Sequence, residues 1–293
     1  MIDTTNEKNK VSPNTLYLVG TPIGNLSDMT QRAVKVLSEV DFVAAEDTRN
    51  SGRLLSYFGI SKPLVSYYEH NKRERGEEIV QRLISGESCA LITDAGMPAI
   101  SDPGEDLVRL CAERGVTVTT IPGACAMITA LTLSALSTSR FVFEGFLPVP
   151  KKERKQRLEQ LSVETRTFIL YEAPHKLRTT LADLCSVLGG DRKIAICREL
   201  TKINEEIQRT TLFEACEIYS SREPRGEYVL VIDGTDKIVS SEKEILKDKD
   251  TLKSAVAELC NSGMSKNLAI KKVAEENGLT RNQLYDMLIE KQI

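Results

Sequence analysis

Short apolar runs bounded by turn residues alternate along the chain with longer segments whose apolar residues recur every three or four positions. The short runs are typical of buried strands, and the longer segments are typical of amphipathic helices. Strands are expected at residues 16–20, 42–46, 64–68, 89–93, 116–121, 141–146, 167–173, 193–200 and 227–233. Helices are expected at roughly 28–39, 49–58, 72–85, 103–114, 124–136, 151–162, 175–188 and 211–219. This alternation predicts βαβ units and largely parallel sheets with right-handed crossovers.

The number of predicted strands exceeds what one open sheet comfortably holds, so we expect two successive α/β domains with a cleft between them. A cluster of glycine and proline at 145–152 marks the break between the two domains. The predicted divisions are a disordered N-terminal tail at 1–13, a first α/β domain at 14–145, a second α/β domain at 146–236, a linker at 237–250 and a small C-terminal helical domain at 251–293.

The last segment of the chain has helical periodicity and no strand-like runs. Ile270, Val273 and Ala274 share one helical face, a turn follows at 278–280, and Leu284 lies on the apolar face of a further helix. A helix, a tight turn and a second helix capped by Thr280 form the helix-turn-helix pattern. Many three-helix units share this pattern, so a docking domain and a nucleic-acid-binding domain both stay open.

The composition indicates a soluble globular protein. A chain of 293 residues with 41% hydrophobic and 28% charged residues argues against wholesale disorder or a fibre. No apolar run reaches the ~20 residues that span a bilayer, and the N-terminus has no apolar signal segment. Seven cysteines without a C-x-x-C pair, together with two histidines, predict reduced thiols and no metal site. We therefore expect a cytoplasmic protein with no membrane partner.

The net charge of −3 gives no overall basic footprint for nucleic acid, but the charge is unevenly distributed. The stretch 151–157 contains five basic residues and one glutamate, a local net charge of +4. The candidate phosphate contacts in this stretch are Lys151, Lys152, Arg154, Lys155 and Arg157. The alternative is a solvated helix face, which charge runs usually form.

Loops rich in small residues follow most of the predicted strands. In parallel α/β sheets ligands bind at the carboxyl ends of the strands, so these loops are the candidate site. They occupy residues 20–28, 44–49, 93–104 and 121–126 in the first half, and 171–176, 198–201 and 225–228 in the second. The first loop has the spacing G-x-x-x-G, which fits neither the dinucleotide fingerprint nor the P-loop, and this argues against a nicotinamide-dependent reductase. Together the loops predict one cleft between two domains.

Three ionisable residues lie within four positions after the second predicted strand: Glu46, Asp47 and Arg49. Such a cluster at a strand end is costly unless it is solvated or paired, and we treat these residues as the catalytic candidates. The alternative is that Asp47 caps the next helix with Arg49 as its partner, which accounts for only part of the charge. The sequence does not single out one residue as a general base.

Seven motifs along the chain resemble one known family. They are LVGTPIGNLSDMT, AAEDTR, LITDAGMPAISDPG, IPGACA, LYEAPHK, CREL and RGEYVLVI, in this order. Together they resemble the cytidine 2′-O-methyltransferases of small-subunit ribosomal RNA, a family within the tetrapyrrole methylase superfamily. The resemblance covers residues 14–234 and extends into the helical tail. It implies S-adenosylmethionine bound in a bent form between two α/β domains, a homodimer, and 16S rRNA of the small ribosomal subunit as substrate.

The resemblance also implies which residues contact the methyl donor. They are Pro22, Gly24, Asp94, Gly96, Met97, Pro98, Ile100, Ser101, Gly123, Cys125, Ala126, Tyr171, Glu172, Leu200 and Gly226. The usual Gly-Asp-Pro of the tetrapyrrole enzymes is Gly-Met-Pro at 96–98, which leaves Asp94 as the nearest carboxylate before the glycine.

Two other functions are considered for this sequence. One is a methyltransferase acting on a tetrapyrrole or another small molecule, against which the missing Gly-Asp-Pro, the basic run and the helical tail argue. The other is a non-catalytic nucleic-acid-binding protein acting through the tail. In that case the cleft would bind nothing.

Overall fold

The computed structural model describes residues 10–235, 249–277 and 279–288. Contacts divide the chain into two units, residues 1–235 and 236–293. Most of the predicted N-terminal tail (1–9) and most of the predicted linker (237–248) lie outside the described residues. The first unit contains two five-stranded sheets, as predicted from the number of strands.

The first sheet has the strand order β3-β2-β4-β1-β5, and all its strands are parallel. These strands are β1 (Thr15–Val19), β2 (Phe42–Ala45), β3 (Leu64–Ser66), β4 (Ser88–Ile92) and β5 (Thr117–Ile121). Every residue of β2 and β4 is buried, because helices cover both faces of the sheet. This explains why these strands read as continuous apolar runs in the sequence.

Helices cover the first sheet in pairs because alternate side chains of each strand point to opposite faces. One face packs against α1 (Gln31–Glu39) and α2 (Thr48–Tyr57). The other face packs against α3 (Lys72–Ile84) and α4 (Gly104–Glu113). In β1, Tyr17 packs on the first face and Leu16 on the second. A short 3-10 turn, η1 (Leu26–Asp28), follows β1 in the loop that leads to α1.

The second sheet has the strand order β6-β7-β10-β8-β9. Of its neighbouring pairs, only β6 with β7 is parallel, and the other pairs are antiparallel. Its strands are β6 (Phe141–Gly145), β7 (Thr167–Glu172), β8 (Lys193–Arg198), β9 (Glu206–Thr211) and β10 (Tyr228–Ile232). The prediction of largely parallel sheets is therefore wrong for this half. The chain turns back directly from β8 into β9, and β10 then enters between β7 and β8 in the opposite direction. The edge strand β9 was not predicted, because it is only half-buried and largely polar.

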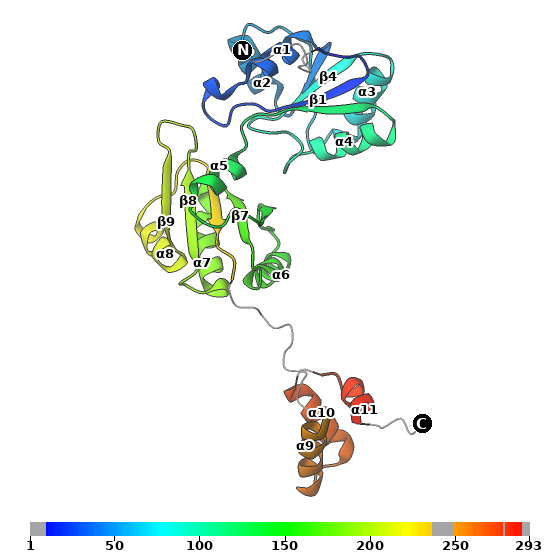
Figure 1. The fold of residues 1–293 in the computed structure, drawn as a ribbon, viewed down its shortest axis with the longest axis vertical. Coiled ribbons are helices and arrows are strands. Elements are labelled where there is room, and N and C mark those ends of the chain that lie inside the picture. The colour runs from blue at the N-terminus through cyan, green and yellow to red at the C-terminus, as the bar shows by residue number, and fades with distance from the viewer. Residues whose placement is uncertain (1–9, 236–248, 278, 289–293) are drawn as a thin grey trace. The chain divides into compact units, whose positions relative to one another are not determined.

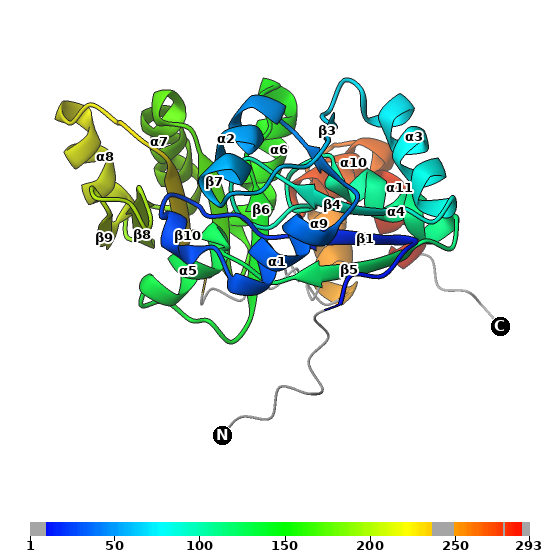
Figure 2. The same cartoon turned by 90° about the horizontal axis from the view of Figure 1, so that it is seen from above.

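One face of the second sheet packs against α6 (Lys151–Ser162), α7 (Leu177–Leu188) and α8 (Leu212–Ser221). The turn η2 (Pro174–Lys176) leads into α7, which lies beside α8 in Figure 2. The other face packs against α5 (Ala126–Leu133), which Figure 1 shows against these strands. The chain thus passes from the first sheet to the second between β5 and α5, and β6 pairs with β7 although it precedes the predicted boundary. The domain boundaries themselves stay predictions.

The described residues of the second unit form three helices that pack on one another, α9 (Lys249–Asn261), α10 (Lys266–Glu276) and α11 (Arg281–Leu288). Ile270, Val273, Ala274 and Leu284 lie in their common core, as the periodicity predicts. Among the described helices of the whole chain, none has the length and apolar character needed to cross a membrane. All the cysteines are free; three are buried and the others are half-buried.

Candidate active site

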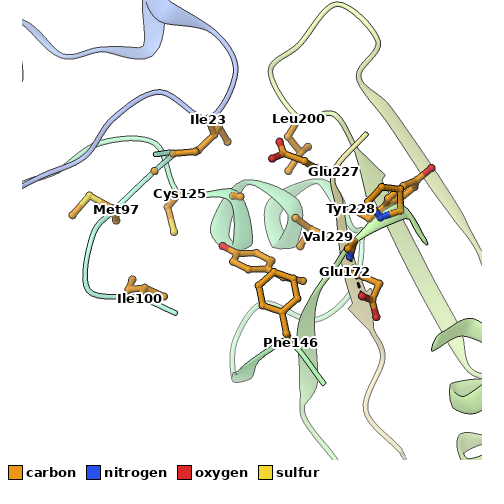
Figure 3. A pocket seen from close by; sticks show the side chains of 16 residues that line it. Ile23, Met97, Ile100, Cys125, Phe146, Glu172, Leu200, Glu227, Tyr228 and Val229 are labelled. Carbon is orange, nitrogen blue, oxygen red and sulfur yellow. Dashed lines mark hydrogen bonds between the residues drawn. The ribbon is translucent and has the colours of Figure 1, made fainter. Parts of the chain in front are cut away.

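A cavity of about 420 Å³ lies between the loops of the first sheet and the strand ends of the second; we call it the central cavity. In Figure 3, Ile23, Met97 and Ile100 lie on one side of it, and Leu200, Glu227 and Val229 lie on the other. The predicted donor contacts that line it are Gly96, Met97, Ile100, Cys125, Ala126, Tyr171, Glu172 and Leu200. Both sheets therefore contribute predicted site residues to one cavity.

The loops after β1 and β4 are joined by backbone hydrogen bonds. Thr21 donates its N–H to the Gly96 carbonyl at 2.9 Å, and Gly96 donates its N–H to the Thr21 carbonyl at 3.1 Å. The Thr21 hydroxyl donates to the Thr93 carbonyl at 3.2 Å. Gly96 has a φ of 84°, which favours glycine at this position. The two loops therefore form one wall of the cavity.

The loop after β5 joins this wall through a close approach of two glycines. A Cβ atom placed on Gly20 would lie 2.7 Å from the Gly123 Cα and 2.7 Å from the Met97 Sδ. Only glycine allows two backbones to approach this closely. Gly123 thus supports the loop that carries Cys125 and Ala126 into the cavity.

Asp102 holds the loop that carries Ile100. Its carboxylate accepts hydrogen bonds from the backbone N–H groups of Ala99 (3.0 Å), Ile100 (3.1 Å) and Gly104 (2.7 Å). Ala99 and Ser101 have φ values of 68° and 62°, which cost about 1–3 kcal/mol each in residues other than glycine. The carboxylate offsets this strain. Asp102 is not among the predicted donor contacts, although it lies in the predicted loop 93–104.

On the second sheet, Glu172 is a buried carboxylate with only 5% of its surface exposed. It accepts hydrogen bonds from the Ala173 N–H at 2.9 Å and from the Thr180 hydroxyl. Thr180 in turn accepts a hydrogen bond from Arg154 at 2.9 Å, and Arg154 pairs with Asp183 at 2.8 Å. This network fixes Glu172 in the cavity wall from behind.

Arg154 is one of the five candidate phosphate contacts, and its side chain is turned toward this network. Arg157 donates to Glu144 at 2.6 Å, and Lys155 lies 3.8 Å from Glu159. Lys151 and Lys152 are exposed. The basic run is therefore divided between ion pairs within α6 and its neighbours and a free end at its first two residues.

Aromatic side chains form part of the central cavity. The Tyr171 ring packs edge-on against Phe143 at 5.0 Å and Phe146 at 5.7 Å between centroids. Burial raises the pKa of Tyr171 to about 12, so its hydroxyl is neutral at physiological pH. Phe146 lines the cavity and is 57% exposed.

A second hollow of about 300 Å³ adjoins the central cavity; we call it the side cavity. Its lining residues are Pro22, Ile23, Gly24, Leu26, Asn50, Ser51, Leu54, Thr93, Asp94, Ala95, Lys202 and Glu227. The predicted donor contacts Pro22, Gly24 and Asp94 lie here and not in the central cavity. Ile23, Ala95 and Glu227 line both cavities.

Lys202 brings the second sheet against the loop after β1. Its ammonium group donates to Glu199 at 2.8 Å and to Glu227 at 2.7 Å. Although burial lowers the pKa of Lys202, these two hydrogen bonds outweigh burial and raise it. A Cβ atom on Gly24 would overlap the Lys202 side chain, so the glycine permits this contact.

Four predicted donor contacts line neither cavity: Pro98, Ser101, Gly123 and Gly226. Ser101 lies close to Gly145, since a Cβ atom placed on Gly145 would be 3.1 Å from the Ser101 hydroxyl oxygen. Gly226 has a φ of 86° and lies against the Glu199 carboxylate. These residues support the cavity walls.

Asp47 and Arg49 form a helix cap. Asp47 is the N-cap of α2 and accepts hydrogen bonds from the Arg49 backbone at 2.8 Å and the Arg49 side chain at 2.9 Å. The hydrogen bonds from Arg49 lower the pKa of Asp47 to about 2. The geometry of this pair is therefore that of the alternative raised from the sequence, in which Asp47 caps the next helix with Arg49 as its partner.

Glu46 is in a different environment from Asp47. It accepts a hydrogen bond from the Thr93 hydroxyl at 3.3 Å, at the rim of the side cavity. Burial, followed by repulsion from Asp94, raises the pKa of Glu46. Of the three catalytic candidates, Glu46 is the one whose carboxylate is made more basic by its surroundings.

Several cavity residues are not among the individual donor contacts predicted from the sequence, although most lie in the predicted loops. They are Ile23, Ala95, Phe146, Ala173, Pro174, Glu227, Tyr228 and Val229. Most adjoin predicted residues in the same motifs, as Ile23 adjoins Pro22 and Gly24. These neighbours could have been found from their positions in the motifs. The pairing of β10 with β7 and β8 brings Tyr228 and Val229, the first residues of β10, to the cavity.

The fold and cavity match one family of enzymes. Residues 15–216 match the family described as Tetrapyrrole (Corrin/Porphyrin) Methylases, and the chain belongs to this family. Membership makes it a methyltransferase and confirms the resemblance found in the sequence.

Two relatives with high sequence identity to this chain carry the same name. The chain is 47% identical to a Synechocystis protein over 94% of this chain and 97% of that protein. It is 44% identical to a Bacillus subtilis protein over 92% of each chain. Both relatives are named ribosomal RNA small subunit methyltransferase I.

Solved structures share the fold. Uroporphyrin-III C-methyltransferase from Thermus thermophilus, complexed with S-adenosylhomocysteine, is 16% identical, with a TM-score of 0.55 over 75% of this chain and 97% of that chain. A cobalt precorrin-4 methyltransferase is 17% identical, with a TM-score of 0.55 over 75% of this chain and 95% of that chain. At this identity the likeness is one of fold.

Proposed function

We propose that this methyltransferase transfers a methyl group from S-adenosylmethionine to the ribose 2′-hydroxyl of a cytidine in 16S rRNA of the small ribosomal subunit. The name of its relatives supports the substrate class. The observation that carries the proposal is the central cavity, on which loops from both sheets converge with predicted donor contacts from each.

The residues of the central cavity fit such a donor. A volume of about 420 Å³ lies within the range of small-molecule sites. Ile23, Leu200 and Val229 offer apolar contact for a flat base, and the Glu172 carboxylate favours a cationic centre. The Glu172 carboxylate accepts hydrogen bonds from Ala173 and Thr180, and its remaining lone pairs can accept others.

When bound, the donor supplies a methyl group on a positively charged sulfur, a leaving group that needs no covalent intermediate. The task of the protein is to hold the acceptor oxygen and the methyl carbon in line, about 3 Å apart. The loops joined through Thr21, Gly20 and Asp102 provide a fixed wall for this purpose.

Glu46 is the proposed general base for the ribose hydroxyl. Its raised pKa brings it closer to neutrality than an ordinary carboxyl, and a positioned base contributes roughly 10²–10⁴-fold to the rate. Asp47 and Arg49 are proposed to hold the start of α2 beside it, since their mutual hydrogen bonds cap this helix.

The start of α6 is proposed to face RNA phosphates, with Lys151 and Lys152 as the direct contacts. Within the described residues these two lysines have no ion pair, unlike Arg154, Lys155 and Arg157. Phosphate contacts of this kind position an RNA strand without reading its sequence. We also propose a homodimer acting in the cytoplasm, on the support of the family resemblance.

The test is incubation with labelled S-adenosylmethionine and small ribosomal subunits that lack the modification, followed by nucleoside analysis. We expect the label in 2′-O-methylcytidine. Subunits that already carry the modification serve as the control and should take up no label. Label on a base or on another nucleoside, or none, would contradict the proposal.

A further inference from the structure

We propose that the side cavity holds the base and ribose of the target nucleotide, while the central cavity holds the donor. This inference rests on the proposed function and assigns its acceptor to a place. The side cavity is formed by the loops after β1 and β4, the first turns of α2, and Lys202 and Glu227.

The first support is contiguity. Methyl transfer requires the acceptor oxygen about 3 Å from the methyl carbon, so an acceptor site must open directly into the donor site. The side cavity shares Ile23, Ala95 and Glu227 with the central cavity. The shared residues make the two cavities neighbours, which places a nucleotide in the side cavity next to the donor.

The second support is a pair of unengaged polar side chains. Asn50 and Asp94 line the side cavity, and among the described residues neither side chain has a hydrogen-bond or ion-pair partner. Thr93 and Lys202 in this wall are occupied, since Thr93 bonds Glu46, and Lys202 bonds Glu199 and Glu227. Both residues of the unengaged pair are exposed, so their polar groups are accessible in the hollow and can bond a ligand in place of water.

The chemistry of these two side chains suits cytosine. The Asp94 carboxylate only accepts hydrogen bonds, and the Asn50 amide both donates and accepts. Cytosine presents an exocyclic amino donor, which a carboxylate accepts. Beside this donor it carries ring acceptors for an amide N–H. Uracil has an oxygen in place of the amino group, and this oxygen would face the carboxylate unfavourably.

The size and position of the side cavity suit one unstacked nucleotide. Its volume of about 300 Å³ lies at the lower end of the range for ligand sites. Pro22, Leu26 and Leu54 give apolar contact for a base that has left its stack. Thr93 lines the cavity and donates to Glu46, so the proposed general base lies at the rim beside the bound ribose.

The first experiment separates donor from acceptor with Asn50→Ala and Asp94→Ala in the full chain. We expect kcat/KM on unmodified small subunits to fall ten- to hundredfold, with donor affinity measured by calorimetry within twofold of wild type. Glu113→Ala is the matched control, since this exposed carboxylate is near the end of α4 and shortly precedes β5. It should leave both values unchanged.

Two results would overturn the inference. A parallel loss of donor affinity would assign the side cavity to the donor, and an unchanged kcat/KM would leave it without a part of the substrate. Failure of the proposed function is distinguishable, because the wild-type chain itself would then place no label on the subunits.

The second experiment tests whether the side cavity discriminates cytidine from uridine. Asp94→Asn should lower the ratio of kcat/KM for cytidine over uridine at the target position at least tenfold; an unchanged ratio would overturn the assignment of Asp94 to the base. Independently of any variant, subunits with 5-iodocytidine at the target, which keeps the exocyclic amino group of cytosine, should photo-crosslink, without donor, to peptides covering 22–26 or 50–54. Crosslinks confined to other segments would overturn the site.

Discussion

Gly20→Ala should damage the donor site through a single added methyl group. A Cβ on Gly20 would lie 2.7 Å from the Gly123 Cα and 2.8 Å from the Gly123 nitrogen. Ordinary carbon contacts are about 3.5–4.0 Å, so the two backbones would need to separate by about 0.8 Å or more. Neither contact atom belongs to a side chain that could rotate away.

The expected cost is the cost of overpacking, about 1–3 kcal/mol in the free energy of unfolding. The displaced loop carries Cys125 and Ala126, which line the central cavity, so donor affinity should fall at least tenfold, about 1.4 kcal/mol. Gly76→Ala is the matched control. Gly76 lies within α3, and a Cβ atom on it would be at an ordinary 3.5 Å from the Leu110 side chain of α4. The substitution should stabilise the chain by up to about 1 kcal/mol.

The assay is urea unfolding for stability and calorimetry for donor affinity, on both variants and wild type. If Gly20→Ala unfolds at the wild-type urea concentration and binds the donor with unchanged affinity, the close packing of these loops does not shape the donor site. A loss of the same size in Gly76→Ala would show that any added methyl group is damaging.

Three further predictions concern other parts of the chain. Thr180→Val should lower the free energy of unfolding by about 1.5–3 kcal/mol, because it removes a hydrogen bond to the buried Glu172, whereas Thr180→Ser should restore it; equal losses in urea unfolding would contradict this. Replacing Lys151 and Lys152 by serine should flatten the salt dependence of RNA binding by about 0.7 per lost phosphate contact, and an unchanged slope would exclude them as contacts. Hydrogen bonds from its arginine partners lower the pKa of Glu206, so their stabilisation is present above pH 4.5 and is lost as the pH falls through the lowered value. Glu206→Gln should therefore weaken the acid dependence of stability, and an acid limb identical to wild type would refute this.

The first sheet could be predicted well because its central strands are buried on both faces. Burial of every residue in β2 and β4 produces apolar runs that periodicity detects directly. The edge strand β9 escaped detection because one edge and part of its surface meet solvent, which admits polar residues such as Gln208 and Arg209. The antiparallel order of the second sheet could not be inferred, since strand direction depends on where β10 enters.

The candidate site could be predicted as a set of loops but not as a set of side-chain directions. Glycine and proline mark Gly96 and Gly123 as points of close approach, and both have that role in the structure. The inward direction of Arg154 depends on the partners that α7 supplies, and a local charge count does not contain this information. Phe146 follows β6 and Glu227 precedes β10, and both reach the cavities because these strands pair with β7, which lies elsewhere in the sequence.

The most direct test of the two-cavity arrangement is a crystal structure of the chain with S-adenosylhomocysteine. We predict that the ligand lies in the central cavity against Ile23, Tyr171 and Leu200, and that the space between Asn50 and Asp94 stays free of it. Ligand density that fills the side cavity, or that lies on another surface of the protein, would contradict this arrangement.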